Sequence, residues 1–434
     1  MIGRFLSHLL LVLLLIFSVG AIGISPAAAD NLWTFWRQSL DDAGIDSNGF
    51  FELRAGRRLV DPVDEKHTSL AEARLQLELN ADFGWGMVKF KNDFLADPVV
   101  DDYLADLREL SLIFSPLDFV DVKIGRQVLT WGTGDLLFVN DLFPKDWKSF
   151  FCGRDTEYLK APSDAVKVSA FFDLVNIDIV YVPLFNGSDY IDGERLSYWN
   201  SVLGRTAGCD DVFHDEDRDA FFNEDEWAIR LYRTINGIEA AFYGYDGYWK
   251  TPEGLNPRSG RLIYPKLRVY GASLRGNLFG GLGSLEAGFY DSRSDRRGDN
   301  PLVRNSEWRL LTGFEHELGR DFTGGIQYYL EYMDDYGDYK RTLPAGMAKK
   351  DRVHSILTLR LTKLLFNQNL NLSCFTYYSP SDKDIYLRPK VSYKVNDHWL
   401  VEGGMNLLFG ADDYTFFGQL EDNTNAFLAT RVSF

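Results

Sequence analysis

Polar and apolar side chains alternate along segments of about ten residues that recur through most of this chain. The segment 70–82 is the clearest, with Ala or Leu at the odd positions and polar or charged residues at the even positions from Glu72 onward. Successive side chains of a β-strand point to opposite faces, so each segment predicts a strand with one apolar face. This pattern restricts the chain to all-β folds. Eighteen strands are predicted, near 49–59, 70–82, 85–96, 105–115, 119–130, 164–173, 175–185, 226–236, 237–249, 265–277, 279–292, 305–316, 319–334, 352–364, 367–379, 383–394, 397–409 and 423–434.

The connections between these predicted strands alternate in length. The even-numbered connections are tight, as at Asn236-Gly237, whereas the odd-numbered ones are longer and two, 131–163 and 186–225, are much longer. Short turns at one end and long loops at the other are typical of a transmembrane β-barrel. A soluble sandwich or propeller has no reason to sort its loops in this way, although alternation alone would also fit a secreted soluble all-β protein.

The two ends of the chain agree with export to the outer membrane. Residues 1–29 have the pattern of a signal peptide, with an apolar run before the small residues Ala27-Ala28-Ala29. The last predicted strand has one apolar face and ends on Phe434, which resembles the signal that the barrel-assembly machinery reads. We therefore expect a barrel in the outer membrane of a Gram-negative bacterium, in contact with membrane lipid and lipopolysaccharide.

The expected organisation is a signal peptide at 1–29, a short periplasmic segment at 30–48 and a β-barrel at 49–434. In the middle segment, Trp and Leu residues are spaced as in a short helix that ends near Gly44. This segment either rests on the rim of the barrel or enters the lumen as a plug.

The composition supports a barrel and excludes some partners. After residue 29 no run of about 18 apolar residues is present, so no spanning helix is predicted, yet aromatic residues make up 15% of the chain. Such a chain suits a barrel with aromatic girdles. The formal charge of −17 argues against binding to nucleic acid.

Eighteen strands enclose a lumen of the size in which porins keep an aqueous channel. The predicted inward faces carry charges of both signs. These charges either pair across strands and stiffen the wall, or leave Arg and Lys unpaired in a pore that favours anions. The pore-lining candidates are Arg74, Lys89, Lys91, Arg230, Arg268, Arg309, Arg360, Arg388, Lys390 and Lys394.

Residues 124–147 carry a family resemblance. A strand ending in Gly125-Arg126-Gln127 is followed by Trp131-Gly132 and by the turn Asn140-Asp141-Leu142-Phe143-Pro144. This segment resembles the alginate-export-like and other large porin-like families of outer-membrane barrels. The resemblance implies an eighteen-stranded barrel, and alginate export would imply an Arg-rich constriction for an acidic polysaccharide. Strict alternation directs Arg126 toward lipid unless a bulge at Gly125 turns it inward.

The connection 131–163 could fold into the lumen and narrow it, or it could be an ordinary exposed loop packed by its own aromatic residues. The candidate constriction residues are Asp135, Asp141, Lys145, Asp146 and Arg154.

Two further sites are suggested by residue type and spacing. Asp215, Asp217 and Asp219 occupy positions 1, 3 and 5 of a calcium loop, with Asn223 at position 9 and Glu226 at position 12. The alternative is a solvated acidic loop, because Ala220 replaces the glycine at position 6. Cys152 and Cys209 lie in the two longest connections and could form a disulfide in an oxidising compartment.

We find no nucleophile motif, metal triad or phosphate loop, so no enzyme is expected, and no cofactor beyond calcium. The sequence predicts an outer-membrane channel for the passive passage of hydrophilic solutes, with an anion preference as the finer hypothesis. The alternatives are an exporter of an acidic polysaccharide and a structural sleeve for a periplasmic or electron-transfer partner.

Overall fold

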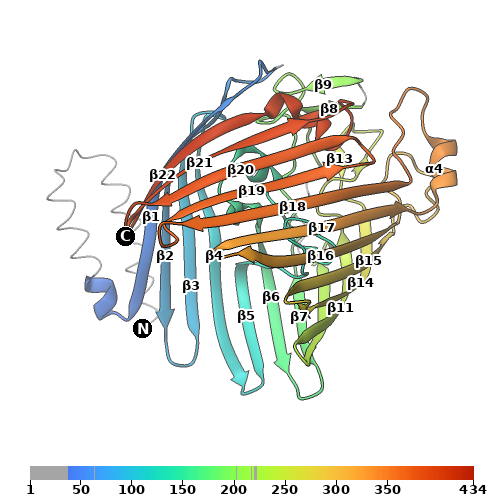
Figure 1. The fold of residues 1–434 in the computed structure, drawn as a ribbon. Coiled ribbons are helices and arrows are strands. Elements are labelled where there is room, and N and C mark those ends of the chain that lie inside the picture. The colour runs from blue at the N-terminus through green and yellow to red at the C-terminus, as the bar shows by residue number, and fades with distance from the viewer. Residues whose placement is uncertain (1–37, 63, 202, 217, 219–221) are drawn as a thin grey trace.

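The computed structural model describes residues 38–62, 64–201, 203–216, 218 and 222–434. Eighteen of its strands form one closed antiparallel barrel (Figure 1). The wall strands are β1 (Ile45–Arg58), β2 (Thr68–Asp82), β3 (Met87–Asp97), β4 (Asp102–Leu117), β5 (Val120–Val128), β6 (Pro162–Phe171), β7 (Asn176–Val182), β10 (Glu226–Ile235), β11 (Ile238–Tyr248), β14 (Lys266–Leu278), β15 (Gly281–Ser292), β16 (Glu307–Gly319), β17 (Phe322–Met333), β18 (Val353–Leu365), β19 (Leu370–Ser379), β20 (Asp384–Lys394), β21 (Trp399–Phe409) and β22 (Asn425–Ser433).

Each wall strand pairs with the wall strands that precede and follow it in the chain, and β22 pairs with β1 to close the barrel. The closure extends to the final residue, because Gly49 and Phe434 exchange backbone hydrogen bonds of 3.2 and 3.0 Å. The predicted strand number, strand positions and closing pair are therefore confirmed.

The predicted alternation of connection lengths is confirmed for most of the chain, but the odd-numbered connections 98–101 and 380–383 are as short as the even-numbered turns. At the turn between β10 and β11, Asn236 and Gly237 have φ values of 52° and 80°. Two successive residues with positive φ make the two-residue hairpin turn whose twist matches that of the strands. Turns of this kind gather at one end of the barrel, which we call the turn side, and the long connections gather at the other, the loop side.

The long connections contain elements that the strand pattern did not predict. The connection between β5 and β6 holds the helix α3 (Trp147–Cys152) and the 3₁₀ helix η1 (Thr156–Leu159). Other loop-side elements are the hairpin of β8 (Tyr198–Asn200) with β9 (Arg205–Ala207), the pair β12 (Gly254–Leu255) with β13 (Leu262–Ile263), the helix α4 (Tyr336–Thr342) and the 3₁₀ helix η2 (Gly418–Asn423).

The described part of the expected N-terminal segment lies outside the barrel wall. Residues 38–42 are helical, and Leu40 packs against Ile45, Leu79 and Phe90. Leu79 lies on the face opposite to Arg74 and Gln76, which point into the lumen, so this packing is on the outer face. This agrees with a segment that rests on the rim. The barrel itself begins at Ile45 rather than at residue 49, and the predicted signal peptide lies outside the described residues.

The barrel is apolar on its outer face. Leu53, Phe242, Leu274 and Leu285 project outward, and their exposed fractions range from 47% to 66%. None of the described helices has the length and the apolar character that crossing a membrane would require.

Candidate functional site: a lumen divided by an infolded loop

The connection between β5 and β6, residues 129–161, folds into the lumen; we call it the infolded loop. Phe150 and Phe151 of its helix α3 pack against Tyr377 and Tyr386 of the opposite wall, with ring centroids 5.2 to 6.3 Å apart. All four side chains are buried. Because the loop carries so many aromatic residues, burying them inside the barrel removes a large apolar area from water. The infolding hypothesis is therefore correct, and the exposed-loop alternative is wrong.

The helix α3 is short and is held by caps at both ends. The carboxylate of Asp146 accepts a hydrogen bond of 2.7 Å from the backbone N–H of Ser149 at the helix N-terminus. Gly153 ends the helix with a φ of 98°, a conformation that favours glycine. A side chain at Gly153 would also collide with the ring of Phe427, which lies 2.6 Å from the place of an added Cβ. The helix thus fits closely against the wall.

A buried carboxylate fixes the first turn of the infolded loop. Glu286 of β15 is 1% exposed. It accepts hydrogen bonds from the backbone N–H groups of Thr133, Gly134 and Asn140 and from the side-chain amide of Asn140. The Gly134 and Asn140 amide bonds are 2.7 and 2.9 Å long. Gly132 (φ 82°) makes the turn that brings these groups together. This single carboxylate therefore orders residues 133–140.

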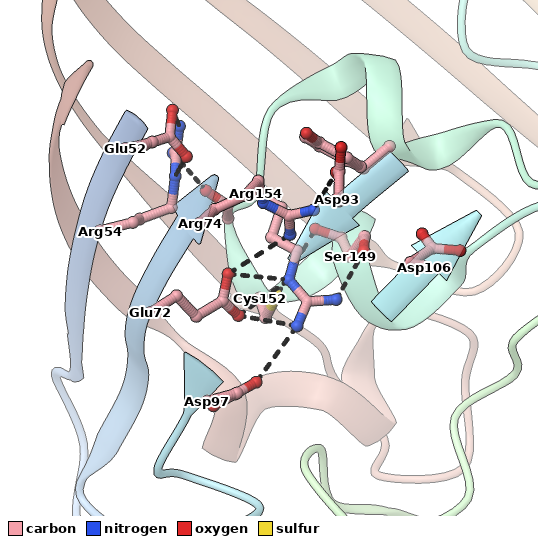
Figure 2. A network of polar contacts seen from close by, with 12 residues as sticks. Glu52, Arg54, Glu72, Arg74, Asp93, Asp97, Asp106, Ser149, Cys152 and Arg154 are labelled. Carbon is pink, nitrogen blue, oxygen red and sulfur yellow. Dashed lines mark hydrogen bonds and ion pairs between the residues drawn. The ribbon is translucent and has the colours of Figure 1, made fainter. Parts of the chain in front are cut away.

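Arg154 anchors the far end of α3 to the wall (Figure 2). Its guanidinium lies 2.7 Å from a carboxylate oxygen of Glu72 on β2 and 3.2 Å from one of Asp97 on β3. Asp97 also pairs with Arg195 from the long loop 183–225. Burial disfavours the charged form of Arg154, but Glu72 and other acidic neighbours such as Asp146 together outweigh burial and hold the pKa of Arg154 well above its usual value. The two longest loops therefore meet at one charged junction.

A second set of ion pairs joins the loop to the closing strands. Asp155 lies 3.9 Å from Lys390 and 3.7 Å from Arg431. Lys390 also pairs with Glu402, and Glu402 with Arg54 at 3.1 Å. Burial disfavours the charged form of Asp155, but Lys390, the backbone N–H of Glu157 and Arg431 together outweigh burial and lower the pKa of Asp155. These groups form a continuous network rather than isolated surface pairs.

Aromatic and cationic groups of loop and wall also stack. The guanidinium of Arg74 lies 4.0 Å from the ring centroid of Tyr158, and that of Arg108 lies 5.1 Å from it. Arg388 lies 4.0 Å from the ring of Phe150. Such cation–π contacts strengthen when water is excluded, as it is around the buried ring of Tyr158.

The infolded loop leaves two cavities in the lumen. The first, the turn-side chamber, has a volume of about 410 Å³ and is lined by the early part of the loop and by strands β10 and β14–β19. Its charged residues are Arg230, Arg275, Arg360, Lys160, Asp135, Asp141 and Glu315. The cations thus exceed the carboxylates by one.

The second cavity, the loop-side chamber, has a volume of about 560 Å³ and is lined by the later part of the infolded loop, by β2–β5 and by loop 183–225. Basic and acidic residues are equal in number here: Arg74, Arg108, Arg126, Lys148, Arg154 and Arg195 against Asp97, Asp102, Asp106, Asp146, Asp189 and Glu194. Asp189 has an exposed side chain at the chamber surface, and partial desolvation together with the neighbouring Asp146 raises its pKa to about 7. The charge of this chamber therefore changes near neutral pH.

Most predicted pore-lining residues do face the lumen, but few are free. Among the described residues, Arg74 pairs with Asp93, Lys91 with Glu157, Arg230 with Glu239, Arg309 with Glu307, Arg360 with Asp135, Lys390 with Glu402, and Lys394 with the turn residue Asp397. Lys89 shares the inward face of Lys91 and lies near Glu109. Most of the basic residues on the inner face of the wall are therefore paired with carboxylates of a neighbouring strand or of the infolded loop.

Arg268 was placed on the wrong face by the sequence pattern. Its neighbours Leu267 and Val269 are buried inside the barrel, and Arg268 points outward, where it pairs with Asp246. The infolded loop supplies an apolar core inside the lumen, so apolar side chains occur on both faces of β14. Hydrophobicity therefore no longer marks the outer face of this strand.

All five predicted constriction residues lie in the lumen. Asp135 pairs with Arg360 at 2.7 Å, and buried Asp141 pairs with Lys145 at 3.0 Å. Burial lowers the pKa of Lys145, against the opposing effect of Asp141. Asp146 and Arg154 hold the helix as described above.

Arg126 borders the loop-side chamber and pairs with Asp164 at 3.0 Å. Because the adjacent Gln127 is buried on the inner face, Arg126 occupies an outward position of β5, as strict alternation predicts. Gly125 has a φ of 117°, but β5 stays in register with both neighbours at this point, so the bulge considered for Gly125 is absent.

The calcium and disulfide hypotheses gain no support. Asp217 and Asp219 lie outside the described residues, and no group of three or more described His, Cys, Asp or Glu residues is arranged to hold a metal ion. Glu226 instead accepts a hydrogen bond of 2.5 Å from Tyr245. Cys152 and Cys209 are both free, so the predicted disulfide is wrong. Cys152 is buried in α3, whereas Cys209 is exposed near the carboxylate of Glu65.

Three functional residues escaped prediction: Lys160, Arg275 and Arg195. Lys160 and Arg195 lie in long loops, where no periodicity assigns a direction. Arg275 shares the inward face of Ser273, which is opposite to the face that the sequence pattern predicts as inward through Arg268. The exposed Leu274 beside it is the signal that could have corrected the register.

Comparisons with protein families and with curated proteins find no match to this chain. Among solved structures, the chain is similar to OccD3 (OpdP) of Pseudomonas aeruginosa, with 9% identity over 90% of this chain and 91% of that one and a TM-score of 0.53. It is also similar to OccK5 (OpdH) of P. aeruginosa, with 11% identity over 90% of this chain and 98% of that one and a TM-score of 0.53. For OccAB3 of Acinetobacter baumannii the identity is 9% over 90% of this chain and 99% of that one, and the TM-score is 0.54. At these identities the likeness establishes the barrel fold.

Proposed function

We propose that this protein is an outer-membrane channel through which small hydrophilic solutes diffuse, and that it favours anions. Its closed barrel with an apolar outer face fits a membrane-spanning position. The likeness to the three Occ barrels supports the same reading of the fold. In this proposal the infolded loop is the filter, and no catalytic step is involved.

The observation that carries the anion preference is the pair of unneutralised cations in the turn-side chamber. Lys160 donates a hydrogen bond of 2.8 Å to the hydroxyl of Thr130, and no carboxylate of a described residue lies within ion-pair distance of Lys160 or Arg275. The other cations of this chamber are paired, as Arg360 is with Asp135. An anion that enters the chamber can therefore bind Lys160 and Arg275 without breaking an existing ion pair.

The geometry also explains how selection could occur without tight binding. Paired charges keep the wall hydrated and rigid, whereas the two unpaired cations raise the local concentration of anions. Because these two cations come from different elements, the loop and β14, a solute meets them together only inside the chamber. Binding at such a site is strong enough to favour entry and weak enough to permit release.

The test is single-channel recording of the chain from Asp30 onward, refolded into a planar lipid bilayer with a salt gradient across it. Discrete current steps with a reversal potential of the anion-selective sign are expected. The double variant K160Q/R275Q should move the reversal potential toward zero, because it removes both unpaired cations.

The matched control is R320Q. Arg320 lies in a turn between β16 and β17 with a 97% exposed side chain, outside both chambers. Equal shifts in R320Q and K160Q/R275Q would contradict a local selectivity site. A correctly inserted but silent barrel would contradict the channel and favour the structural sleeve, and current block by an acidic oligosaccharide alone would favour the exporter.

A further inference from the structure

A belt of aromatic side chains runs around the outer face of the barrel near its loop side. Tyr181 of β7 and Trp227 of β10 are cross-strand partners with ring centroids 4.5 Å apart. Farther along the wall, Phe289 of β15 and Trp308 of β16 are partners with ring centroids 4.7 Å apart. Exposed aromatic rings at this level are typical of the water interface of a membrane barrel.

Between these two aromatic pairs, a row of charged residues crosses the outer face of the wall. The register places Trp227 opposite Asp246, Asp246 opposite Arg268, and Arg268 opposite Asp291. The three charged residues extend the row of Tyr181 and Trp227 across β11, β14 and β15, strands that lie side by side in Figure 1. On β14 and β15 they lie two positions nearer the loop side than the exposed Tyr270 and its partner Phe289, which continue the aromatic row. Arg293, just beyond β15, lies 3.6 Å from the carboxylate of Asp246.

The charges on this part of the wall are accessible. The side chain of Asp246 is 53% exposed and that of Arg268 is 36% exposed. Lys266, at the start of β14, is also exposed. Together Lys266, Arg268 and Arg293 outnumber Asp246 and Asp291 by one positive charge. We call these five residues the charged gap.

The guanidinium groups in the charged gap keep hydrogen-bond donors to spare. Arg268 uses Nε, 2.6 Å from Asp246, and one terminal nitrogen on the same carboxylate oxygen. A guanidinium carries five N–H donors in a planar fork that matches phosphate. Arg268 and Arg293 flank one carboxylate, so their remaining donors are held close together. This arrangement is suited to an anionic group with several oxygens.

We propose that the charged gap binds a phosphate group of lipopolysaccharide. The charged gap faces outward and lies at the loop side, which in an outer-membrane barrel is the extracellular side. This inference rests on the proposed location, since the outer leaflet there is made of lipopolysaccharide. A phosphate beside Arg268 and Arg293 would neutralise the excess positive charge, and the acyl chains would lie against the aromatic belt and the apolar wall below.

The experiment measures binding of fluorescently labelled, bisphosphorylated lipid A to the refolded chain in detergent micelles. The double variant R268Q/R293Q should bind at least tenfold more weakly than the unchanged protein. The matched control is R233Q. Arg233 is an outward-facing arginine of β10 at the turn side, where its side chain donates a hydrogen bond to the backbone carbonyl of Leu174. The affinity of R233Q for lipid A should equal that of the unchanged protein.

Two further probes define what would overturn the proposal. Lipid A without phosphates should bind the unchanged protein weakly, with an affinity similar to that of bisphosphorylated lipid A for R268Q/R293Q. If the unchanged protein bound both forms of lipid A equally well, a phosphate site would be overturned. Vesicles of phosphatidylglycerol should bind weakly, and an affinity equal to that of lipid A would show a general phospholipid site instead.

Folding and function are separated by two additional measurements. The variant R268K/R293K keeps both charges, and it should fold and retain more affinity than R268Q/R293Q; equal loss in both variants would overturn charge recognition. The same preparations are recorded in planar bilayers. If the unchanged protein conducts but does not bind lipid A, the lipopolysaccharide site is overturned and the channel is not. If it binds lipid A but conducts no current, the channel is overturned and the lipopolysaccharide site is not.

Discussion

Removing the carboxylate of Glu286 should release the first turn of the infolded loop. In the variant E286A, the backbone N–H groups of Thr133, Gly134 and Asn140 lose their acceptor, while the side chain of Asn140 keeps a hydrogen bond of 3.3 Å to the carbonyl of Ala272. An orphaned buried donor costs about 1–3 kcal/mol, so three donors cost about 3–9 kcal/mol. Water in the turn-side chamber can reach this turn, which favours the lower value.

The variant E286Q tests the same argument with little change in volume. The glutamine amide keeps one oxygen as an acceptor, but its NH₂ group faces the N–H donors whose hydrogen bonds the other carboxylate oxygen accepted. About half of the anchoring is lost, on the order of 2 kcal/mol or more. The expected order of loop stability is therefore unchanged protein, E286Q, then E286A.

Hydrogen exchange of the loop amides, read by mass spectrometry on peptides that cover 129–146, measures this directly. A loss of about 3 kcal/mol corresponds to exchange roughly a hundredfold faster, and single-channel records should become noisier as the loop detaches. E239Q is the control, because Glu239 pairs with Arg230 on the wall. Exchange within threefold of the unchanged protein in E286A would refute the anchoring argument.

Three further outcomes are expected. Partial desolvation and the neighbouring Asp146 raise the pKa of Asp189 to about 7. Lowering the pH from 8 to 6 should therefore neutralise Asp189, add one net positive charge to the loop-side chamber and increase the anion preference in reversal-potential measurements. D189N should remove this pH response. The same raised pKa means that Asp189 favours the folded loop most below pH 4 and that this contribution is lost as the pH rises toward 7. R154Q should lower the urea midpoint of unfolding, because buried Glu72 loses its shortest ion pair and keeps only the longer contacts to Arg74 at 3.7 Å and Arg195 at 4.0 Å. The loss in the free energy of unfolding should be about 1.5–3 kcal/mol, and an unchanged midpoint would contradict the junction. A thiol reagent should label Cys209 rapidly and Cys152 only after unfolding, and equal labelling would show that α3 is not buried.

Much of the wall followed from the alternating pattern. In residues 70–82 and 353–363 the apolar residues lie mainly on one face, with Leu70 and Ile356 as the exceptions that join the core inside the lumen, because lipid and lumen impose opposite demands on the two faces. Their strands, β2 and β18, therefore lie close to the predicted places. The turn at Asn236-Gly237 was equally visible, since few residue types adopt two successive positive φ values.

The site was less accessible to such reasoning. The sequence offered Arg388, Lys390 and Lys394 as a track of free cations, but Lys390 and Lys394 are paired, and Arg388 stacks on Phe150 of the loop. The pairing depends on where the infolded loop puts Asp155 and Phe150, and no local pattern encodes that position. Lys160 and Arg275, the two cations of the turn-side chamber that pair with no carboxylate of a described residue, came from a loop and from a strand with apolar residues on both faces.

The sequence by itself determined the number of strands, their order and the side on which each connection lies, because these depend on local alternation and on turn residues that act within a few positions. Only the tertiary structure decided that residues 129–161 enter the lumen, that Glu286 and Arg154 hold them there, and which cations stay unpaired. These outcomes depend on contacts between residues more than a hundred positions apart, such as Asn140 with Glu286. Their energies exist only once the barrel has closed around the loop and excluded most of the water.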